Sequence, residues 1–174
     1  MGDTLKDLKE RRSVRKFKAE QVKDSELDAV LEAGTWAASG DGAQAAVMVV
    51  LQDAEKIAGL EKLNARVLGP ESKAKTFYGA PTVVTVLADN RQVTWADDGN
   101  MVIGNLINAA HAVGLGSCYI WRARELFDGE EGKALLKEWG LDENYRGVGH
   151  VILGYAAETP KSRPRKSGYI IKVR

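Results

Sequence analysis

Apolar residues recur at a helical spacing in two segments near the start of the chain. Leu5 and Leu8 lie three residues apart in a charged stretch, which predicts a short helix over residues 4–12. In residues 22–38 the apolar positions follow a helical period, with Asp24 or Ser25 as the expected N-cap. The members of that period are Leu27, Val30, Leu31 and Gly34.

Three more helices are predicted farther along the chain. Residues 53–64 read as a helix opened by Asp53, and residues 130–140 as a helix closed by a glycine. Residues 96–114 form the longest and most apolar of these segments. Its apolar residues, Met101 among them, leave few positions for solvent, so we expect a central buried helix.

Short runs rich in β-branched residues alternate with these helices and predict buried strands. They cover residues 46–52, 82–88, 117–121 and 147–156, and residues 65–79 read as a loop. One central sheet with packed helices follows, in an α/β or α+β domain spanning residues 1–174. Residues 169–173, "YIIKV", also resemble a strand. No local partner remains for it, so pairing with another subunit is expected.

Composition is that of an ordinary globular protein, with 44% hydrophobic and 28% charged residues. Lys and Arg total 25 against 24 Asp and Glu, and the pI is about 7.8. That balance argues against a nucleic-acid-binding domain, which is typically basic overall. The charged N-terminus has no secretory signal pattern, and no run is long enough to span a membrane. A cytoplasmic location is expected.

Several kinds of active site find little support in the sequence. The only histidines, His111 and His150, fall in different elements, and with one cysteine no zinc site is expected. Both histidines, and Cys118, are interpreted as core residues. No G-x-S-x-G elbow is present. The "GLGSC" glycines follow a helix and open a strand, the reverse of a dinucleotide fingerprint.

Positive charge is concentrated at two places instead. "RRSVRKF" carries Arg11, Arg12 and Arg15 beside the Ser13 hydroxyl, and "PKSRPRK" at residues 160–166 is a second basic cluster. Guanidinium groups bind phosphate oxygens through paired hydrogen bonds. Convergence of both clusters on one phosphate is one interpretation. Two solvated termini, or a weak nucleic-acid contact, are the alternatives at this point.

Four segments in order resemble the FMN-dependent nitroreductase family. They are the "RRSVRKF" opening, "LEAGTWAASGDGAQ" at residues 31–44, "GNLINAAHAVGLGSCYIW" at residues 104–121, and "ILGYAAETPKSRPRK" at residues 152–166. The resemblance implies an α+β fold with a mixed, mainly antiparallel sheet surrounded by helices. It also implies a homodimer with the C-terminal strand exchanged between subunits and FMN bound at the interface.

The resemblance assigns a set of flavin-binding residues. The N-terminal cluster would hold the phosphate and ribityl chain, completed by Arg163 with either Arg165 or Lys161. Asn64 resembles the residue at the flavin pyrimidine edge. Two further groups match the flavin loop and the strand end beside the isoalloxazine ring: Ala38, Ser39, Gly40 and Gly42, then Tyr119, Ile120, Trp121 and Arg122.

Three positions depart from the family pattern. Ala38 replaces a common proline, Gly42 a frequent asparagine, and Gly104 a glutamine. The implied function is electron transfer from NADH or NADPH through FMN to nitroaromatic, quinone or similar acceptors, by a ping-pong mechanism. No protein side chain is expected to be catalytic, because the flavin carries the chemistry. An FMN-binding or FMN-storing protein with little turnover is the alternative.

Overall fold

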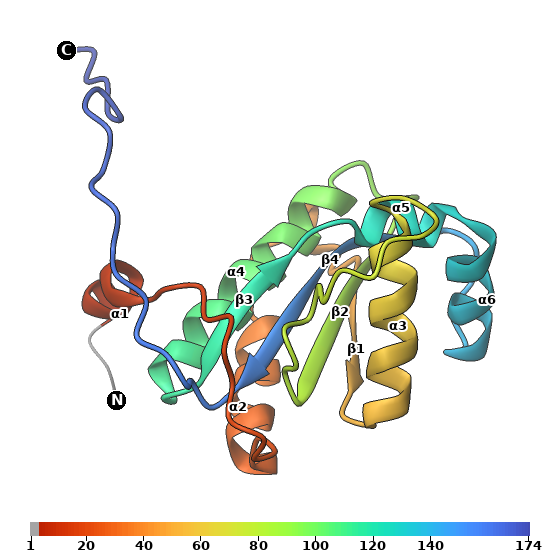
Figure 1. The fold of residues 1–174 in the computed structure, drawn as a ribbon. Helices are drawn as coiled ribbons and strands as arrows, with labels where there is room; N and C mark the ends of the chain where they lie inside the picture. Colours follow the sequence, from red (N-terminus) through yellow and green to blue (C-terminus); the bar gives the residue numbers. More distant parts are fainter. Residues whose placement is uncertain (1–3) are drawn as a thin grey trace.

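The computed structural model describes residues 4–174 as one four-stranded sheet with helices on both faces (Figure 1). The strands are β1 (Ala46–Leu51), β2 (Thr82–Asp89), β3 (Gly116–Ile120) and β4 (Tyr145–Gly154). The α-helices are α1 (Thr4–Glu10), α2 (Asp24–Thr35), α3 (Ala54–Arg66), α4 (Trp95–Ala112), α5 (Ala123–Asp128) and α6 (Glu130–Glu138), with a short 3-10 turn at Gly40–Gly42.

The strand order is β1-β2-β4-β3, and each neighbouring pair is antiparallel. The α+β prediction is therefore confirmed. The expected mixed character is reduced to one isolated parallel bridge between Ser13 and Ser117. A register shift between Val86 and Leu87 interrupts the pairing of β2 with β4. The two central strands are almost completely buried, as their continuous apolar runs predict.

Alternating side chains of β2 face two separate cores. Val84 and Val86 pack with residues of α2 and α4, whereas Val83 and Leu87 pack with residues of α3, α5 and α6. This alternation is the period of two expected of a strand. Figure 1 shows the corresponding layers, with α2 and α4 on one face and α3 and α6 on the other.

Helix α4 is buried on only one side. Its residues Val102, Ile103, Leu106 and Ala110 face the sheet and α2, but Met101 is half exposed. The expected central buried helix is therefore buried on one face only in the described chain, residues 4–174. On the covered side α2 approaches closely at Gly34: a Cβ there would lie 2.8 Å from the Met48 sulfur, so the Met48 side chain would have to shift.

Helix boundaries follow the sequence with two exceptions. Asp53 caps α3 as expected, accepting a hydrogen bond from the Lys56 amide at 2.9 Å. The prediction for α2 is wrong by one position: Lys23 is the N-cap and no side chain caps the helix. Helix α5 was not predicted, because its six residues are too few to show a helical period.

The C-terminal segment forms no strand within the described chain. Residues 157–174 extend away from the sheet (Figure 1), and the side chains of Ile170 and Ile171 are 75% and 85% exposed. The expected strand therefore has no partner in the single chain. Pairing with a second subunit stays a prediction.

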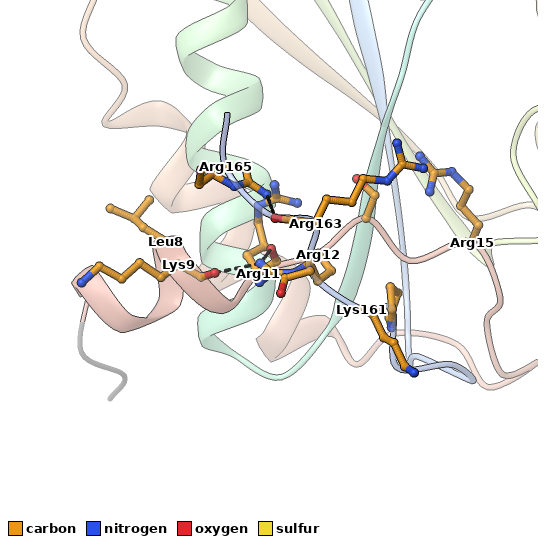
Figure 2. A pocket seen from close by; sticks show the side chains of 11 residues that line it. Leu8, Lys9, Arg11, Arg12, Arg15, Lys161, Arg163 and Arg165 are labelled. Carbon is orange, nitrogen blue, oxygen red and sulfur yellow. Dashed lines mark hydrogen bonds between the residues drawn. The ribbon is translucent and has the colours of Figure 1, made fainter. Parts of the chain in front are cut away.

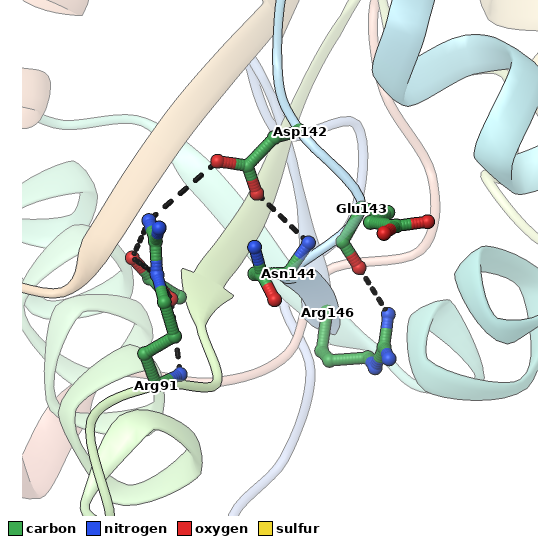
Figure 3. Close-up of polar contacts among 6 residues, drawn as sticks. Arg91, Asp142, Glu143, Asn144 and Arg146 are labelled. Carbon is green, nitrogen blue, oxygen red and sulfur yellow. Dashed lines mark hydrogen bonds and ion pairs between the residues drawn. The ribbon is translucent and has the colours of Figure 1, made fainter.

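A polar network joins two loops at one end of the sheet (Figure 3). The Arg91 guanidinium donates to both carboxylate oxygens of Asp89 and lies 3.5 Å from Asp142. Hydrogen bonding to Arg91 is the main cause that lowers the pKa of the Asp89 carboxyl. Asp142 also accepts from the Asn144 amide at 2.8 Å. These contacts fix the loop after β2 against the loop before β4.

The two histidines differ in environment. His150 is fully buried on β4, where its Nδ1 lies 2.9 Å from the Thr85 hydroxyl, as expected of a core residue. Burial lowers the pKa of His150 to about 3. His111 is instead partly exposed, with its Nε2 4.0 Å from Asp7, so its prediction as a core residue is wrong. Cys118 is buried, as predicted.

The depressed pKa of His150 predicts an acid-sensitive fold. An unfolded histidine takes up a proton below about pH 6.5, whereas the folded one stays neutral down to about pH 3. Stability is therefore lost as the pH falls through this window, by about 2 kcal/mol between pH 7 and pH 5. Urea denaturation should show that His150→Leu reduces this loss. His111→Leu, at a position that water already reaches, should keep the loss of the parent chain, and equal losses in all three would contradict the assignment.

Candidate functional site

The segment 11–18, here called the arm, links α1 to the far edge of the sheet. The Val14 amide donates to the Ser117 carbonyl at 2.9 Å, and the Lys18 amide donates to the Tyr155 carbonyl at 2.9 Å. The Ala157 amide donates back to the Lys16 carbonyl at 2.8 Å. Backbone bonds thus place the arm between β3 and the start of the C-terminal segment.

This pairing brings the two basic clusters together around one cavity of about 860 Å³ (Figure 2). Residues 157–174 are here called the tail. Seven cations line the cavity: the five arginines and Lys161 named from the sequence, and Lys9. Among residues 4–174 no carboxylate lines the cavity, and Ser13 adds a hydroxyl. The lining residues are Leu8, Lys9, Arg11, Arg12, Ser13, Arg15, Pro160, Lys161, Ser162, Arg163 and Arg165.

Orientation within this basic cavity differs among the tail residues. Figure 2 shows Lys161 directed away from Arg11 and Arg12, whereas Arg165 lies close to them. The Arg165 guanidinium donates to the Arg163 carbonyl at 2.9 Å. All three tail cations line the cavity, so the choice between Lys161 and Arg165 as the partner of Arg163 stays open.

Crowding of like charge is unfavourable here without an anion. Burial, and next the neighbouring Arg12 charge, lower the pKa of Arg11. The Arg12 guanidinium donates to the carbonyls of Lys9 at 2.7 Å and Arg11 at 2.6 Å, which orients it without neutralising it. A phosphate dianion would supply both the charge and the acceptor oxygens that these groups lack.

Glu158 is a positioning residue that the sequence did not reveal. Its Oε1 accepts the backbone amide of Arg15 at 2.6 Å, across 143 positions of sequence. The bond fixes the arm to the tail at the point where the two clusters meet. A lone acid in a basic tail gives no sequence signal of this kind, because its partner is a backbone amide.

A second cavity of about 310 Å³ adjoins the first, since Arg15 lines both. Asn64 is fully buried at its wall, and neither its Nδ2 nor its Oδ1 has a hydrogen-bond partner among residues 4–174. The buried Thr76 hydroxyl is unpartnered as well. The remaining lining residues are Leu68, Ala74, Lys75, Tyr78, Cys118, Tyr119, Ile120, Trp121 and Arg122.

The strand end predicted beside the flavin ring forms one wall of this second cavity. Trp121 is 58% exposed, and the Arg122 guanidinium lies 4.7 Å from the centre of its ring. Arg122 has φ of 84°, in the left-handed region that non-glycine residues rarely adopt. Burial, and next the charge of Glu125, raise the pKa of Tyr119. The rare backbone conformation marks a constrained turn.

The predicted flavin loop lies apart from both cavities. Ala38 and Ser39 line a third cavity of about 140 Å³, between α2 and α4. The Gly40 amide donates to the buried Asp98 carboxylate at 3.0 Å, and Gly42 has φ of 68°. One chain therefore unites the phosphate-site and ring-site residues but leaves the loop residues outside. Asp98, which anchors the loop, was not predicted.

Aromatic residues fall into two groups. Phe77 is buried in the core, whereas its neighbour Tyr78 borders the second cavity. Trp139 packs on Phe127 with ring centres 5.6 Å apart, and Trp95 packs in the other core. Trp36, beside the loop, is 81% exposed.

Residues 8–155 match the Nitroreductase family, and the chain belongs to that family. An NADPH-flavin oxidoreductase of Vibrio harveyi is 27% identical over 98% of this chain and 73% of its own length. FMN-bound nitroreductases of Bacteroides fragilis and Desulfitobacterium hafniense have the same fold, with TM-scores of 0.90 and 0.87. Each is 28% identical, with both chains fully covered.

The residues of the two cavities fit FMN. A dianion suits the basic cavity, and the unpartnered Asn64 amide offers a donor and an acceptor to a flat polar edge such as the flavin pyrimidine. Within residues 4–174, no cluster of three His, Cys, Asp or Glu side chains could hold a metal ion. Over the same range, no helix has the length and apolar character needed to cross a membrane.

The unpartnered amide makes a prediction about the ligand-free protein. Asn64→Leu removes two buried polar atoms at similar volume and should raise the free energy of unfolding by about 1–3 kcal/mol. Asn105→Leu is the matched control, because the Asn105 amide donates to the Ala33 carbonyl at 2.9 Å. Urea denaturation without FMN measures both. A loss of stability in Asn64→Leu would mean that the amide has a partner.

Proposed function

We propose that the protein is an FMN-dependent oxidoreductase that passes electrons from NADH or NADPH to nitroaromatic, quinone or similar acceptors. The observation that carries this proposal concerns residues 4–174: a basic cavity that no carboxylate of this range lines adjoins a second cavity walled by Asn64, whose amide has no hydrogen-bond partner in the same range. Family membership and the names of the similar proteins support it.

In this proposal the two cavities hold different parts of the cofactor. Arg11, Arg12, Ser13, Arg15 and Arg163, with Arg165 or Lys161, bind the phosphate and ribityl chain. Asn64 binds the pyrimidine edge, and residues 119–122 lie beside the ring. Arg15 borders both cavities, so its charge can stabilise negative charge on the reduced pyrimidine.

Bound FMN supplies the chemistry, accepting a hydride from the nicotinamide and passing two electrons to the acceptor. The chain's own residues position the two substrates in turn at one site, which is why a ping-pong scheme is proposed. Anaerobic addition of NADH or NADPH to the FMN-loaded protein tests this. We expect rapid loss of the visible absorbance band of oxidised flavin, restored by an acceptor. Bound flavin that stays oxidised would favour a storage protein instead.

We further propose a homodimer that completes each site. The loop with Ala38, Ser39, Gly40 and Gly42 lies outside the two cavities of its own chain, so a partner's loop is suited to close them. Half-exposed Met101 on α4, and the exposed apolar tail, are surfaces for the partner. Exchange of the tail would give its residues 169–173 a strand to pair with.

If the arginines of the arm bind the FMN phosphate, here called the phosphate clamp, their removal should cause a large and specific loss of FMN affinity. Arg11→Ala with Arg15→Ala removes two charged donors and should weaken FMN binding about 100-fold or more, with little change in unfolding midpoint. Lys16→Ala with Lys18→Ala is the matched control. It removes the same charge from side chains that line neither cavity. Flavin fluorescence titration measures the FMN affinity of both double variants. Equal affinities would contradict the phosphate clamp.

The dimer predicts an effect of the tail's apolar residues. Ile170→Ala with Ile171→Ala removes buried apolar area if the tail packs on a partner, and should raise the dimer dissociation constant about 100-fold or more. Lys172→Ala with Arg174→Ala, in the same tail, should leave it nearly unchanged. Light scattering coupled to size exclusion over a dilution series measures the mass. A monomeric parent protein at high concentration would rule out the dimer.

A further inference from the structure

We propose that the second cavity selects aromatic acceptors that carry a negative charge, such as aromatic carboxylates, and that Arg122 recognises that charge. This inference rests on the proposed function, because it concerns the acceptor that follows the nicotinamide into the same site. Three features support the inference: the exposed ring of Trp121, the guanidinium of Arg122 and the charges of the cavity wall.

The Trp121–Arg122 pair projects from a rigid turn. Ile120 before it and Ala123 after it are both buried, and they fix the ends of β3 and α5. Between them Trp121 is 58% exposed and its ring carries the Arg122 guanidinium at 4.7 Å. Exposed tryptophan is costly to solvate and suits a flat apolar ligand. The pair therefore offers a ring and a positive charge side by side.

The cavity wall has an excess of positive charge. Arg15, Lys75 and Arg122 line it, and no Asp or Glu of the described residues does. Lys75 is partly neutralised, because its Nζ lies 3.7 Å from Glu61, and Arg15 is assigned to the cofactor. Within residues 4–174, no carboxylate forms an ion pair with Arg122. Residues 119–122 are assigned to the flavin ring through their backbone, so the Arg122 side chain is the wall's cation that remains for a substrate.

Charge recognition also answers a problem that the proposed chemistry creates. Reduced flavin is an anion, so an anionic acceptor approaching it is repelled. A fixed guanidinium beside the ring offsets that repulsion, and a planar group can donate two parallel hydrogen bonds to a carboxylate. Tyr78, whose ring lies 6.0 Å from the Arg15 guanidinium, borders the same cavity and adds a second aromatic surface.

The experiment compares ligands that differ only in charge. With FMN-loaded protein, kcat/KM is measured for 4-nitrobenzoate and 4-nitrobenzamide, and binding of benzoate and benzamide to the oxidised protein is measured by calorimetry. We expect the parent protein to favour the anion about tenfold in both assays. In Arg122→Gln both anion-to-neutral ratios should fall at least fivefold.

Arg124→Gln is the matched control. Arg124 is two residues away, stacks on Trp95 at 5.0 Å and does not line the cavity, so its loss should leave both ratios unchanged. A second arm compares NADPH with NADH in Arg122→Gln. A change confined to that donor ratio would assign Arg122 to the donor's phosphate and overturn the proposal.

The outcomes separate this inference from the proposed function. Two results overturn the inference alone. One is turnover of both acceptors without preference for the anion, and the other is an anion-to-neutral ratio that Arg122→Gln leaves unchanged. Absence of flavin reduction and of turnover with both acceptors overturns the proposed function. The benzoate-to-benzamide binding ratio still decides in that case whether Arg122 recognises anions.

Discussion

The placement of the arm by backbone hydrogen bonds is the constraint on which the rest of the site depends. The Val14 amide is bound to β3 and the Lys18 amide to Tyr155 just after β4, so the arm's arginines line one cavity with the tail. Glu158 completes this junction by accepting the Arg15 amide. Because the bonds involve main-chain atoms, the side-chain charges stay unneutralised. A sheet edge is used here to hold like charges together, an arrangement that only an anionic partner stabilises.

Much of the fold could be predicted from the sequence, because its strands are continuous apolar runs and its helices are long enough to show a period. Asp53 capped α3 as expected, whereas α5 is too short to be detected and Lys23 gives no capping signal. Burial was harder to predict. Met101 and His111 lie on an apolar helix yet face outward, since a period identifies a face but not the element that covers it.

The candidate site, like the fold, could be predicted from the sequence only in part. Arginine clusters at residues 11–15 and 163–165 are visible in the sequence, and the structure brings them together. Residues that act through backbone geometry were not visible. Glu158 binds the Arg15 amide, and Asp98 holds the loop through the Gly40 amide. Neither of these roles depends on a residue type at a fixed spacing, so no motif could have indicated them.

The exposed tail has a consequence for the way the chain is made. A segment with adjacent isoleucines and high strand propensity is an aggregation hazard while it is unpaired. This one follows all four strands in the chain, so during synthesis it emerges after their sequences are already available to fold. Its neighbours Lys166, Lys172 and Arg174 add repulsion between nascent copies. Order of synthesis and local charge together protect this segment from aggregation until the sheet has formed.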